Sequence, residues 1–187
     1  GILVVPAGAP PEYLGGYLGP YRLLRSDLVV FTMASGPSFR TENLSELLSH
    51  VQRWNPDARI VITDLDPGPM GDVRGKTVFL ATTAPPIDAP EQVSRLQSNH
   101  GCTVVGWSAA LSDRPQLTAD LQEAPGFEVL LTELKAAAVD VGVKQAIERG
   151  SEVVFLDNRP VAIDGETDVD DAIRWALELA ISRKGVG

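Results

Sequence analysis

Short runs of apolar, often β-branched residues alternate along the chain with longer segments in which apolar residues recur every three or four positions. The first pattern is typical of buried strands and the second of amphipathic helices, so their alternation predicts a parallel α/β sheet. The predicted strands cover residues 2–6, 28–33, 59–63, 77–82, 103–107, 128–131 and 152–156. The predicted helices cover residues 42–53, 90–100, 115–123, 133–149 and 169–183. We therefore predict a mostly parallel sheet with helices on both faces.

Two places rich in turn-forming residues interrupt this pattern. Residues 66–71 contain prolines and glycines in close succession and are predicted to be a loop. Residues 157–160 predict a turn, after which 161–163 form a short returning strand. The aspartates that close two of the strands, Asp64 and Asp157, could supply a magnesium-binding carboxylate. The turn interpretation is favoured, because strands often end in turns that contain aspartate.

Composition limits the classes of protein to which the chain can belong. With 187 residues, 44% of them apolar, it can bury a core, and we predict a single α/β domain over residues 1–187. The net charge of −9 excludes a general nucleic-acid or membrane-surface protein, so any phosphate site must be a local basic pocket. The single cysteine excludes an intramolecular disulfide and fits a reducing cytoplasm. One cysteine and two histidines are too few to favour a zinc site of Cys and His ligands.

We expect neither a membrane span nor a signal peptide. A start at Gly1, inside a strand pattern and without methionine, indicates a piece of a longer polypeptide.

Three junctions between a strand and the following helix carry a cation. Lys135 is predicted in the first turn of one helix, Arg114 beside the start of a second, and Arg40 just before a third. Unpaired N–H groups make a helix start positive, so a cation there is unfavourable by roughly a few tenths of a kcal/mol. An anion bound between the cation and these N–H groups removes the conflict. Each cation alone could be solvated or paired with a carboxylate such as Glu133. Three cations along one edge of a parallel sheet, where ligands bind, favour a phosphorylated ligand.

The segment 11–22 combines glycines with three tyrosines. It is too rich in glycine for a stable helix and too aromatic for a solvated linker. One interpretation is a loop that folds over a ligand, with Arg22 as an anion clamp and Glu12 or tyrosines such as Tyr17 as hydrogen-bonding groups. The alternative, which the sequence leaves equally open, is a packed connector whose tyrosines cover the edge of the core.

One apparent motif is discarded. Gly75, Lys76 and Thr77 match the end of a phosphate-binding P-loop, but that motif requires glycine at position 70, where Met70 stands. A P-loop lysine also opens a helix, whereas the residues after Lys76 are predicted to form a strand.

Several segments together resemble the C-terminal part of the cyclic 2,3-diphosphoglycerate synthetase family. They are, in order, residues 12–14 with 16–22, 27–33, 82–85, 111–115 and 132–140. The resemblance implies a P-loop NTPase-like, Rossmann-like three-layer fold and an ATP-dependent ligase. In this reaction one phosphate of 2,3-diphosphoglycerate is activated by phosphoryl transfer, and the neighbouring phosphate displaces inorganic phosphate to form a cyclic anhydride. ATP is then the nucleotide, and magnesium is expected with it.

The chemistry that the resemblance implies agrees with the cations at the helix starts. Two phosphates of one molecule meet only if several negative charges are cancelled, a task suited to arginine forks and a lysine point charge. We assign Arg114 and Lys135 as catalytic residues. The expected substrate-binding residues are Arg22, Arg40, Glu12, Tyr17, Ser112 and Glu133. Glu133 could hold Lys135 in place or contact magnesium, Asp140 is expected to be a partner on the helix face, and no metal ligand is identified.

The chain departs from this family in one respect, because the family carries its glycine-rich phosphate loop before the part seen here. Residues 1–187 contain no such loop. We therefore expect an upstream P-loop portion of the same protein as partner, besides a small phosphorylated substrate, and an isolated chain that is inactive. Self-association into a homo-oligomer stays open, whereas nucleic acid and membrane are not expected as partners.

Two other functions stay open. A non-catalytic sensor domain for a sugar phosphate or nucleotide could use the same cationic edge, since a fold alone does not fix a function. An ATP-dependent ligase for a different acid phosphate would need the same basic pocket. A glycine-rich loop ending in Gly-Lys-Thr or Gly-Lys-Ser, encoded just before Gly1, would favour the synthetase.

Overall fold

The computed structural model describes residues 1–163 and 168–184, and the chain divides into two compact units. Unit 1 consists of residues 1–66 and 160–187, and unit 2 of residues 67–159. Each unit has its own hydrophobic clusters, and the single α/β domain over residues 1–187 stays a prediction. No helix in the described ranges is long and apolar enough to cross a membrane.

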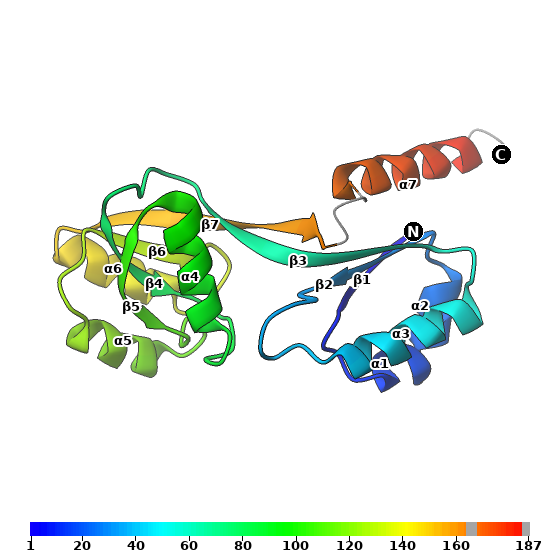
Figure 1. Ribbon diagram of the computed structural model, residues 1–187, viewed down its shortest axis with the longest axis horizontal. Helices are drawn as coiled ribbons and strands as arrows, with labels where there is room; N and C mark the ends of the chain where they lie inside the picture. The colour runs from blue at the N-terminus through cyan, green and yellow to red at the C-terminus, as the bar shows by residue number, and fades with distance from the viewer. Residues whose placement is uncertain (164–167, 185–187) are drawn as a thin grey trace. The chain divides into compact units, whose positions relative to one another are not determined.

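Unit 1 is a sheet covered by helices on both faces (Figure 1). Its strands, which pair in parallel, are β1 (Ile2–Pro6), β2 (Leu28–Thr32) and β3 (Arg59–Pro69). Its helices are α1 (Glu12–Gly15), α2 (Gly19–Leu24), α3 (Thr41–Trp54) and α7 (Val169–Lys184). The first three helices cover one face of the sheet around Phe31, and α7 covers the other through Ala172 and Ala176. The prediction of helices on both faces is confirmed here.

Unit 2 repeats this three-layer arrangement (Figure 1). Its strands are β4 (Thr77–Ala81), β5 (Thr103–Ser108), β6 (Val129–Glu133) and β7 (Glu152–Ala162). Its helices are α4 (Ala89–His100), α5 (Arg114–Glu123) and α6 (Val139–Glu148). The strands lie in the order β7, β6, β4, β5 and pair in parallel. Alternate residues of β6 face opposite layers: Leu131 packs with Leu96 of α4, and Leu130 packs with Leu117 of α5.

The loop predicted at 66–71 is wrong for residues 66–69, which belong to a long strand, whereas residues 70 and 71 lie outside it. The turn predicted at 157–160 is wrong, because a second long strand runs through it. β3 extends to Pro69 and β7 extends to Ala162. The two strands are neighbours in the strand order, and the Met70 N–H donates to the Phe155 carbonyl oxygen at 2.8 Å. A β-carbon at Gly68 would lie 3.3 Å from the Asp157 carbonyl oxygen, so glycine there permits the close approach. Strand pairing therefore overrides the turn propensity of these residues.

The helix predicted at 133–149 begins only at Val139. Glu133 still belongs to β6, and residues 134–138 form the connection. The alanines 136–138 favour a helix by propensity, but the Ala138 N–H donates to the Leu111 carbonyl oxygen at 3.0 Å, which fixes the connection to the neighbouring loop. Lys135 therefore lies in a loop, and its predicted place in the first turn of a helix is wrong.

The glycine- and tyrosine-rich segment 11–22 forms the short helices α1 and α2 instead of an irregular loop. Pro20 lies in the first turn of α2, where its missing N–H has no cost. Gly19 is required by packing, because a β-carbon there would lie 2.1 Å from the Leu14 carbonyl oxygen. The low helix propensity of this segment limits both helices to a few residues but does not prevent them from forming.

Candidate functional site

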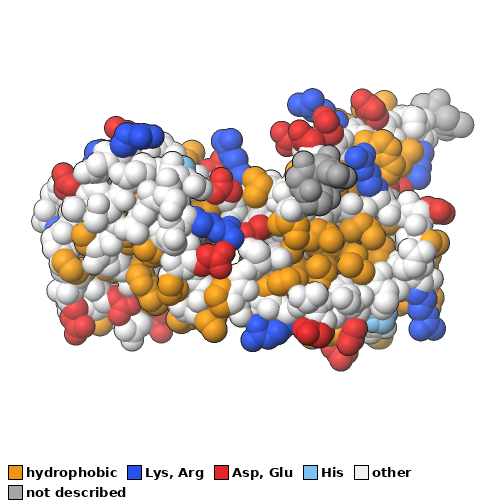
Figure 2. All heavy atoms as spheres, in the orientation of Figure 1, with side chains coloured by type: hydrophobic (Ala, Val, Ile, Leu, Met, Phe, Trp, Pro, Cys, Tyr) orange, Lys and Arg blue, Asp and Glu red, His pale blue; other side chains and the backbone are white. Residues whose placement is uncertain are grey.

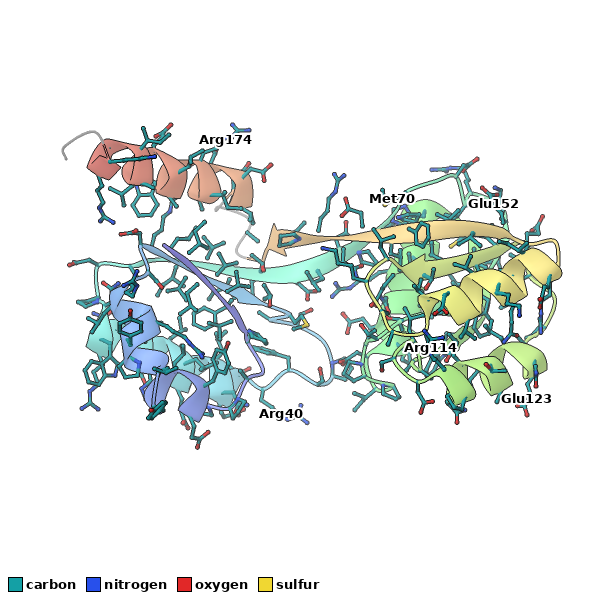
Figure 3. All side chains as sticks on the ribbon, turned by 180° about the vertical axis from the view of Figure 1, so that it is seen from behind. Arg40, Met70, Arg114, Glu123, Glu152 and Arg174 are labelled. Carbon is teal, nitrogen blue, oxygen red and sulfur yellow. The ribbon has the colours of Figure 1, made fainter. Side chains whose placement is uncertain are left out.

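The expected site residues divide equally between the two units, and each unit is described by itself. Unit 1 holds Glu12, Tyr17, Arg22 and Arg40, and unit 2 holds Ser112, Arg114, Glu133 and Lys135. Figure 3 labels Arg40 and Arg114, one cation of each unit. In both units the cations expected at the helix starts follow the carboxyl ends of parallel strands, where α/β proteins bind ligands.

Glu133 ends β6 and is held by the residues that follow β4. Its Oε1 accepts from the Thr82 hydroxyl at 2.6 Å and from the Thr83 N–H at 3.0 Å, and its Oε2 accepts from the Thr83 hydroxyl at 2.6 Å. The carboxylate is therefore ordered by three donors. Of the two roles expected for Glu133, holding Lys135 is not seen: Lys135 is exposed and has no ion pair within the described ranges.

Thr82 connects three strand ends at this edge. Its side chain is fully buried, and its hydroxyl oxygen also accepts from the Ala84 N–H at 3.0 Å. Its N–H donates to the Ser108 carbonyl oxygen at 2.9 Å, and its carbonyl oxygen accepts from the Leu111 N–H at 3.3 Å. Thr82 thus joins the ends of β4 and β5 to Glu133 of β6. Sequence patterns did not identify Thr82 as a site residue, because its partners on the other strand ends lie about 25 to 50 positions away in the chain.

Arg114 opens α5, as predicted, and is held by Asp140 in the first turn of α6. The contact is bidentate: Nη1 to Oδ2 and Nη2 to Oδ1 are both 2.9 Å. The hydrogen bond from Arg114 lowers the pKa of the Asp140 carboxyl, and the guanidinium charge adds to the effect. Both side chains are more than half exposed, which leaves them accessible to a ligand. The sequence predicted Asp140 as a partner on the helix face without identifying the residue that it contacts, and the structure shows that this residue is Arg114.

The neighbouring hollow in unit 2 is a separate feature. Ser108 donates to Asp120 at 2.5 Å, and Gln116 donates to the other oxygen of the same carboxylate at 2.7 Å. Beside them lies a pocket of about 510 Å³. Its walls are Phe79, Pro86, Gly106, Trp107, Ser108, Ala109, Ala110, Gln116, Asp120, Glu123 and Ala124. None of the expected site residues lines it, so the pocket does not coincide with the predicted anion site.

In unit 1, Arg40 is the residue just before α3, as predicted. Its Nη1 donates to the carbonyl oxygens of Pro37 at 2.8 Å and Phe39 at 2.9 Å, so the guanidinium closes the loop that leads into the helix. At the start of the same loop Met33 has a φ of 56°, a left-handed conformation that is uncommon for a residue with a side chain. The loop is thus held by side-chain contacts in an unusual backbone conformation.

The same loop brings a hydroxyl to a carboxylate. The Ser35 hydroxyl donates to Asp64 Oδ2 at 2.6 Å. Asp64 lies within β3, so its interpretation as a turn residue is wrong. The described ranges contain no group of three or more His, Cys, Asp or Glu that could hold a metal ion.

The remaining expected residues of unit 1 belong to the two short helices. Arg22 stacks on Tyr13, with its guanidinium carbon 5.2 Å from the ring centroid. Glu12 lies in the first turn of α1, and Tyr17 is 98% exposed between the helices. Arg22 is thus oriented by an aromatic ring, a neighbour that the sequence did not indicate.

Comparisons with known proteins place two models of one family on consecutive parts of the chain. Residues 1–64 match the P-loop domain of cyclic 2,3-diphosphoglycerate synthetase, and residues 69–159 match the C-terminal domain of the same synthetase. The boundary between the two matches falls close to the boundary between units 1 and 2. Residues 1–64 nevertheless contain no Gly-Lys-Ser or Gly-Lys-Thr sequence.

Similar full-length proteins carry the same description. The cyclic 2,3-diphosphoglycerate synthetase of Methanothermus fervidus is 42% identical over 182 residues, which is 96% of this chain and 40% of that protein. The synthetase of Rubrobacter xylanophilus is 43% identical over 166 residues, 88% of this chain and 38% of that protein. The chain thus spans about 40% of the length of these relatives. Among solved structures, unliganded arylmalonate decarboxylase has a TM-score of 0.34 and 12% identity over 82% of this chain and 85% of that chain, a likeness too weak to carry an argument.

Proposed function

Because the chain belongs to the cyclic 2,3-diphosphoglycerate synthetase family, we propose that it is part of an ATP-dependent cytoplasmic enzyme that closes 2,3-diphosphoglycerate into its cyclic anhydride. The observation that carries the proposal is the match of two models of this family to residues 1–64 and 69–159. In the proposed reaction a phosphate of the substrate accepts the terminal phosphoryl group of ATP. An oxygen of the neighbouring phosphate then attacks the activated phosphorus, a new P–O–P bond forms, and inorganic phosphate leaves.

The task of this chain in the reaction is to cancel and position phosphate charge, which is the main part of catalysis in phosphoryl transfer. Lys135 is the cation best suited to contact the transferring group, since it is exposed and makes no ion pair with any described residue. Arg114 uses one side of its guanidinium on Asp140, so the donors left over can bind a phosphate oxygen without breaking that pair.

The cations of unit 1 have a supporting role in this proposal. Arg22 rests on Tyr13, and Arg40 donates to two loop carbonyls, so both guanidinium groups are oriented before any anion binds. Such orientation lowers the entropic cost of binding a phosphate. Glu12 and Tyr17, at the surface of unit 1, and Ser112, in the loop before α5, remain candidates for hydrogen bonds to the substrate.

Within this chain, Ser35 and Asp64 could bind magnesium, whereas no glycine-rich loop is present to bind the ATP phosphates. Ser35 and Asp64 offer two hard oxygen atoms 2.6 Å apart, and magnesium commonly takes one or two such ligands together with waters and phosphate oxygens. When bound there, the ion would neutralise phosphate charge. The chain has no P-loop sequence to cradle the ATP phosphates, so we propose that another portion of the synthetase supplies it.

Titration of 2,3-diphosphoglycerate into the chain by calorimetry, at low and moderate salt, tests the substrate assignment. We expect binding that falls with salt and that is lost in an Arg114→Ala, Lys135→Ala double variant. The matched control is Lys144→Ala, Arg174→Ala, which removes the same charge from exposed side chains outside the site. Equal affinity of both double variants would contradict the assignment of Arg114 and Lys135.

A sensor domain would bind the same ligand without reaction. In a full-length synthetase that contains this chain, with ATP and magnesium, the proposed enzyme releases one inorganic phosphate for each cyclic product. Binding of 2,3-diphosphoglycerate without phosphate release would favour the sensor instead.

A further inference from the structure

β1 lies at the end of the strand order but has the composition of an interior strand. Only β2 pairs with it in the described part of the chain. Leu3 and Val5 face the core under α3, whereas Ile2 and Val4 point to the opposite face and are 48% and 55% exposed. Strands that are apolar on both faces belong to the interior of parallel sheets, and edge strands usually carry charges, prolines or bulges. From Ile2 to Val5, the outer side of β1 therefore carries no charged side chain, proline or bulge.

Helix α7 extends this apolar surface. Trp175 lies on its β3 side, because the Arg59 guanidinium lies 5.6 Å from the centroid of its ring. At about 100° per residue, Ile173 and Leu177 project from the opposite side of the helix, toward β1. They are 43% and 58% exposed. We call the surface formed by Ile2, Val4, Ile173 and Leu177 the β1–α7 trough. Figure 2 shows hydrophobic side chains gathered over the sheet of unit 1 beside α7.

The other terminal strand in the order, β5 of unit 2, shows what a protected edge looks like in the same chain. It begins at Thr103 and ends at Ser108, and Gly106 interrupts its apolar residues. Its pairing with β4 shifts register between Val78 and Phe79, which is a bulge. A bulge is one of the devices by which natural edges avoid further pairing. In β1, Ile2 to Val5 pair with β2 without a register shift, and a proline stands only at the end of the strand, at Pro6.

We propose that the β1–α7 trough is the docking surface for the P-loop-bearing portion of the same synthetase, which adds a parallel strand beside β1 and covers the trough with a helix. A P-loop connects a strand to a helix, so this portion supplies both elements that the trough lacks. Residues 1–64 match the family's P-loop domain without containing the P-loop sequence, and the chain spans about 40% of its relatives. The proposal rests on the proposed function for its partner, whereas the docking itself is measurable without catalysis.

The test compares amide hydrogen exchange in two proteins. One is the 187-residue chain, and the other is the full-length Methanothermus fervidus synthetase in which this chain replaces the 182-residue segment that it matches. We expect peptides of β1 and of the trough side of α7 to exchange at least about tenfold more slowly in the full-length protein, since protection follows burial and hydrogen bonding. Equal exchange of β1 in the two proteins would overturn the proposal.

Variants locate the docking surface. In the full-length protein Val4→Glu and Leu177→Glu should each accelerate exchange of β1 by about tenfold or more, because they place an unpaired carboxylate in the interface. Ile147→Glu, at an equally exposed apolar residue of unit 2, is the control and should leave β1 unchanged. Val4→Thr keeps the shape of the side chain and should accelerate exchange of β1 more weakly. It therefore tests the same contact if Val4→Glu fails to fold. Unchanged β1 exchange in all of these variants would overturn the assignment of the trough.

The remaining outcomes separate docking from function. Protection of β1 in the isolated chain that grows with protein concentration would identify a second copy as the occupant and overturn the proposed partner. A full-length protein that protects β1 but neither binds nor cyclises 2,3-diphosphoglycerate would support the docking surface and refute the proposed function. A protein that cyclises the substrate with an unprotected β1 would refute the docking surface alone.

Discussion

The replacement of Thr82 by valine tests whether this residue organises the edge of unit 2. Valine keeps the shape of the side chain but removes a donor to Glu133 Oε1 and an acceptor for the Ala84 N–H. A hydrogen bond to a charged acceptor contributes about 1.5–3 kcal/mol, and a buried N–H left without a partner costs about 1–3 kcal/mol. Glu133 keeps its two bonds from Thr83, and Ala84 is only half-buried. We therefore expect unit 2 to lose roughly 3 kcal/mol of unfolding free energy, toward the lower end of the summed range.

Urea denaturation followed by tryptophan emission measures this loss. Trp107 is the tryptophan of unit 2, so Trp54 and Trp175 are replaced by phenylalanine in every variant to isolate its signal. Thr83→Val is the matched control, because it removes one bond to the same carboxylate from an exposed residue and should cost less than about 1 kcal/mol.

A double-mutant cycle then tests the mechanism. Combined with Glu133→Gln, the Thr82→Val change should be non-additive by about 1 kcal/mol or more, since the two residues share a bond. A loss below about 0.5 kcal/mol for Thr82→Val, or strict additivity in the cycle, would refute the view that Thr82 joins these strand ends through Glu133.

Three further predictions follow from single features of the two units. Arg114 lowers the pKa of Asp140, so the stability that this pair contributes is present above the usual carboxyl pKa range and is lost as the pH falls through the lowered pKa. In an NMR titration, the pKa of Asp140 should be higher in Arg114→Ala than in the parent chain, and an unchanged pKa would contradict the pairing. Gly19→Ala should destabilise unit 1 by about 2–3 kcal/mol in thermal unfolding, because the added β-carbon meets the Leu14 carbonyl oxygen, whereas Gly8→Ala, with open space around it, should change stability by less than about 0.5 kcal/mol. Burial raises the pKa of the Cys102 thiol, so a disulfide reagent should label it slowly in the folded chain and rapidly in urea; equal rates would show that the thiol is accessible.

The sequence predicted most of the fold because the strands and helices that form its layers follow from local patterns of apolar residues. Apolar runs such as that of β2 and the periodic apolar positions of α3 depend only on neighbours in the chain. Arg40 and Arg114 were placed correctly at helix starts for the same reason. The errors came where tertiary pairing outweighs local propensity, as in the proline- and glycine-containing end of β3. The alanines before α6 are a second case, since Ala138 is held by Leu111 from a different loop.

The contacts of the candidate site could not be read in this way. Thr82 and Glu133 meet only because β4 and β6, which are not consecutive in the chain, are neighbours in the sheet. Arg114 and Asp140 meet because α5 and α6 start at the same edge. Sequence periodicity indicates which face of an element is buried but not which elements are adjacent. The positions of the junctions between strands and helices therefore identified the candidate cations, but the sequence did not identify the side chains that orient them.

The corrected position of Lys135 changes the electrostatic argument for a phosphate site without removing it. In the first turn of a helix, the ammonium would have opposed the helix dipole, and an anion was needed to relieve that conflict. In the loop before α6 it precedes the helix start, and Ala138 at the N-cap provides no side-chain bond to the N–H groups of the first turn. A phosphate approaching this end of α6 would meet the lysine and the positive end of the helix together, so both would attract it. Asp140, in the same turn, would repel such an anion if it were not neutralised by Arg114. The bidentate pair therefore does more than orient the guanidinium: it keeps the one carboxylate in the first turn of α6 from opposing phosphate, and loss of Arg114 should weaken anion binding through both effects.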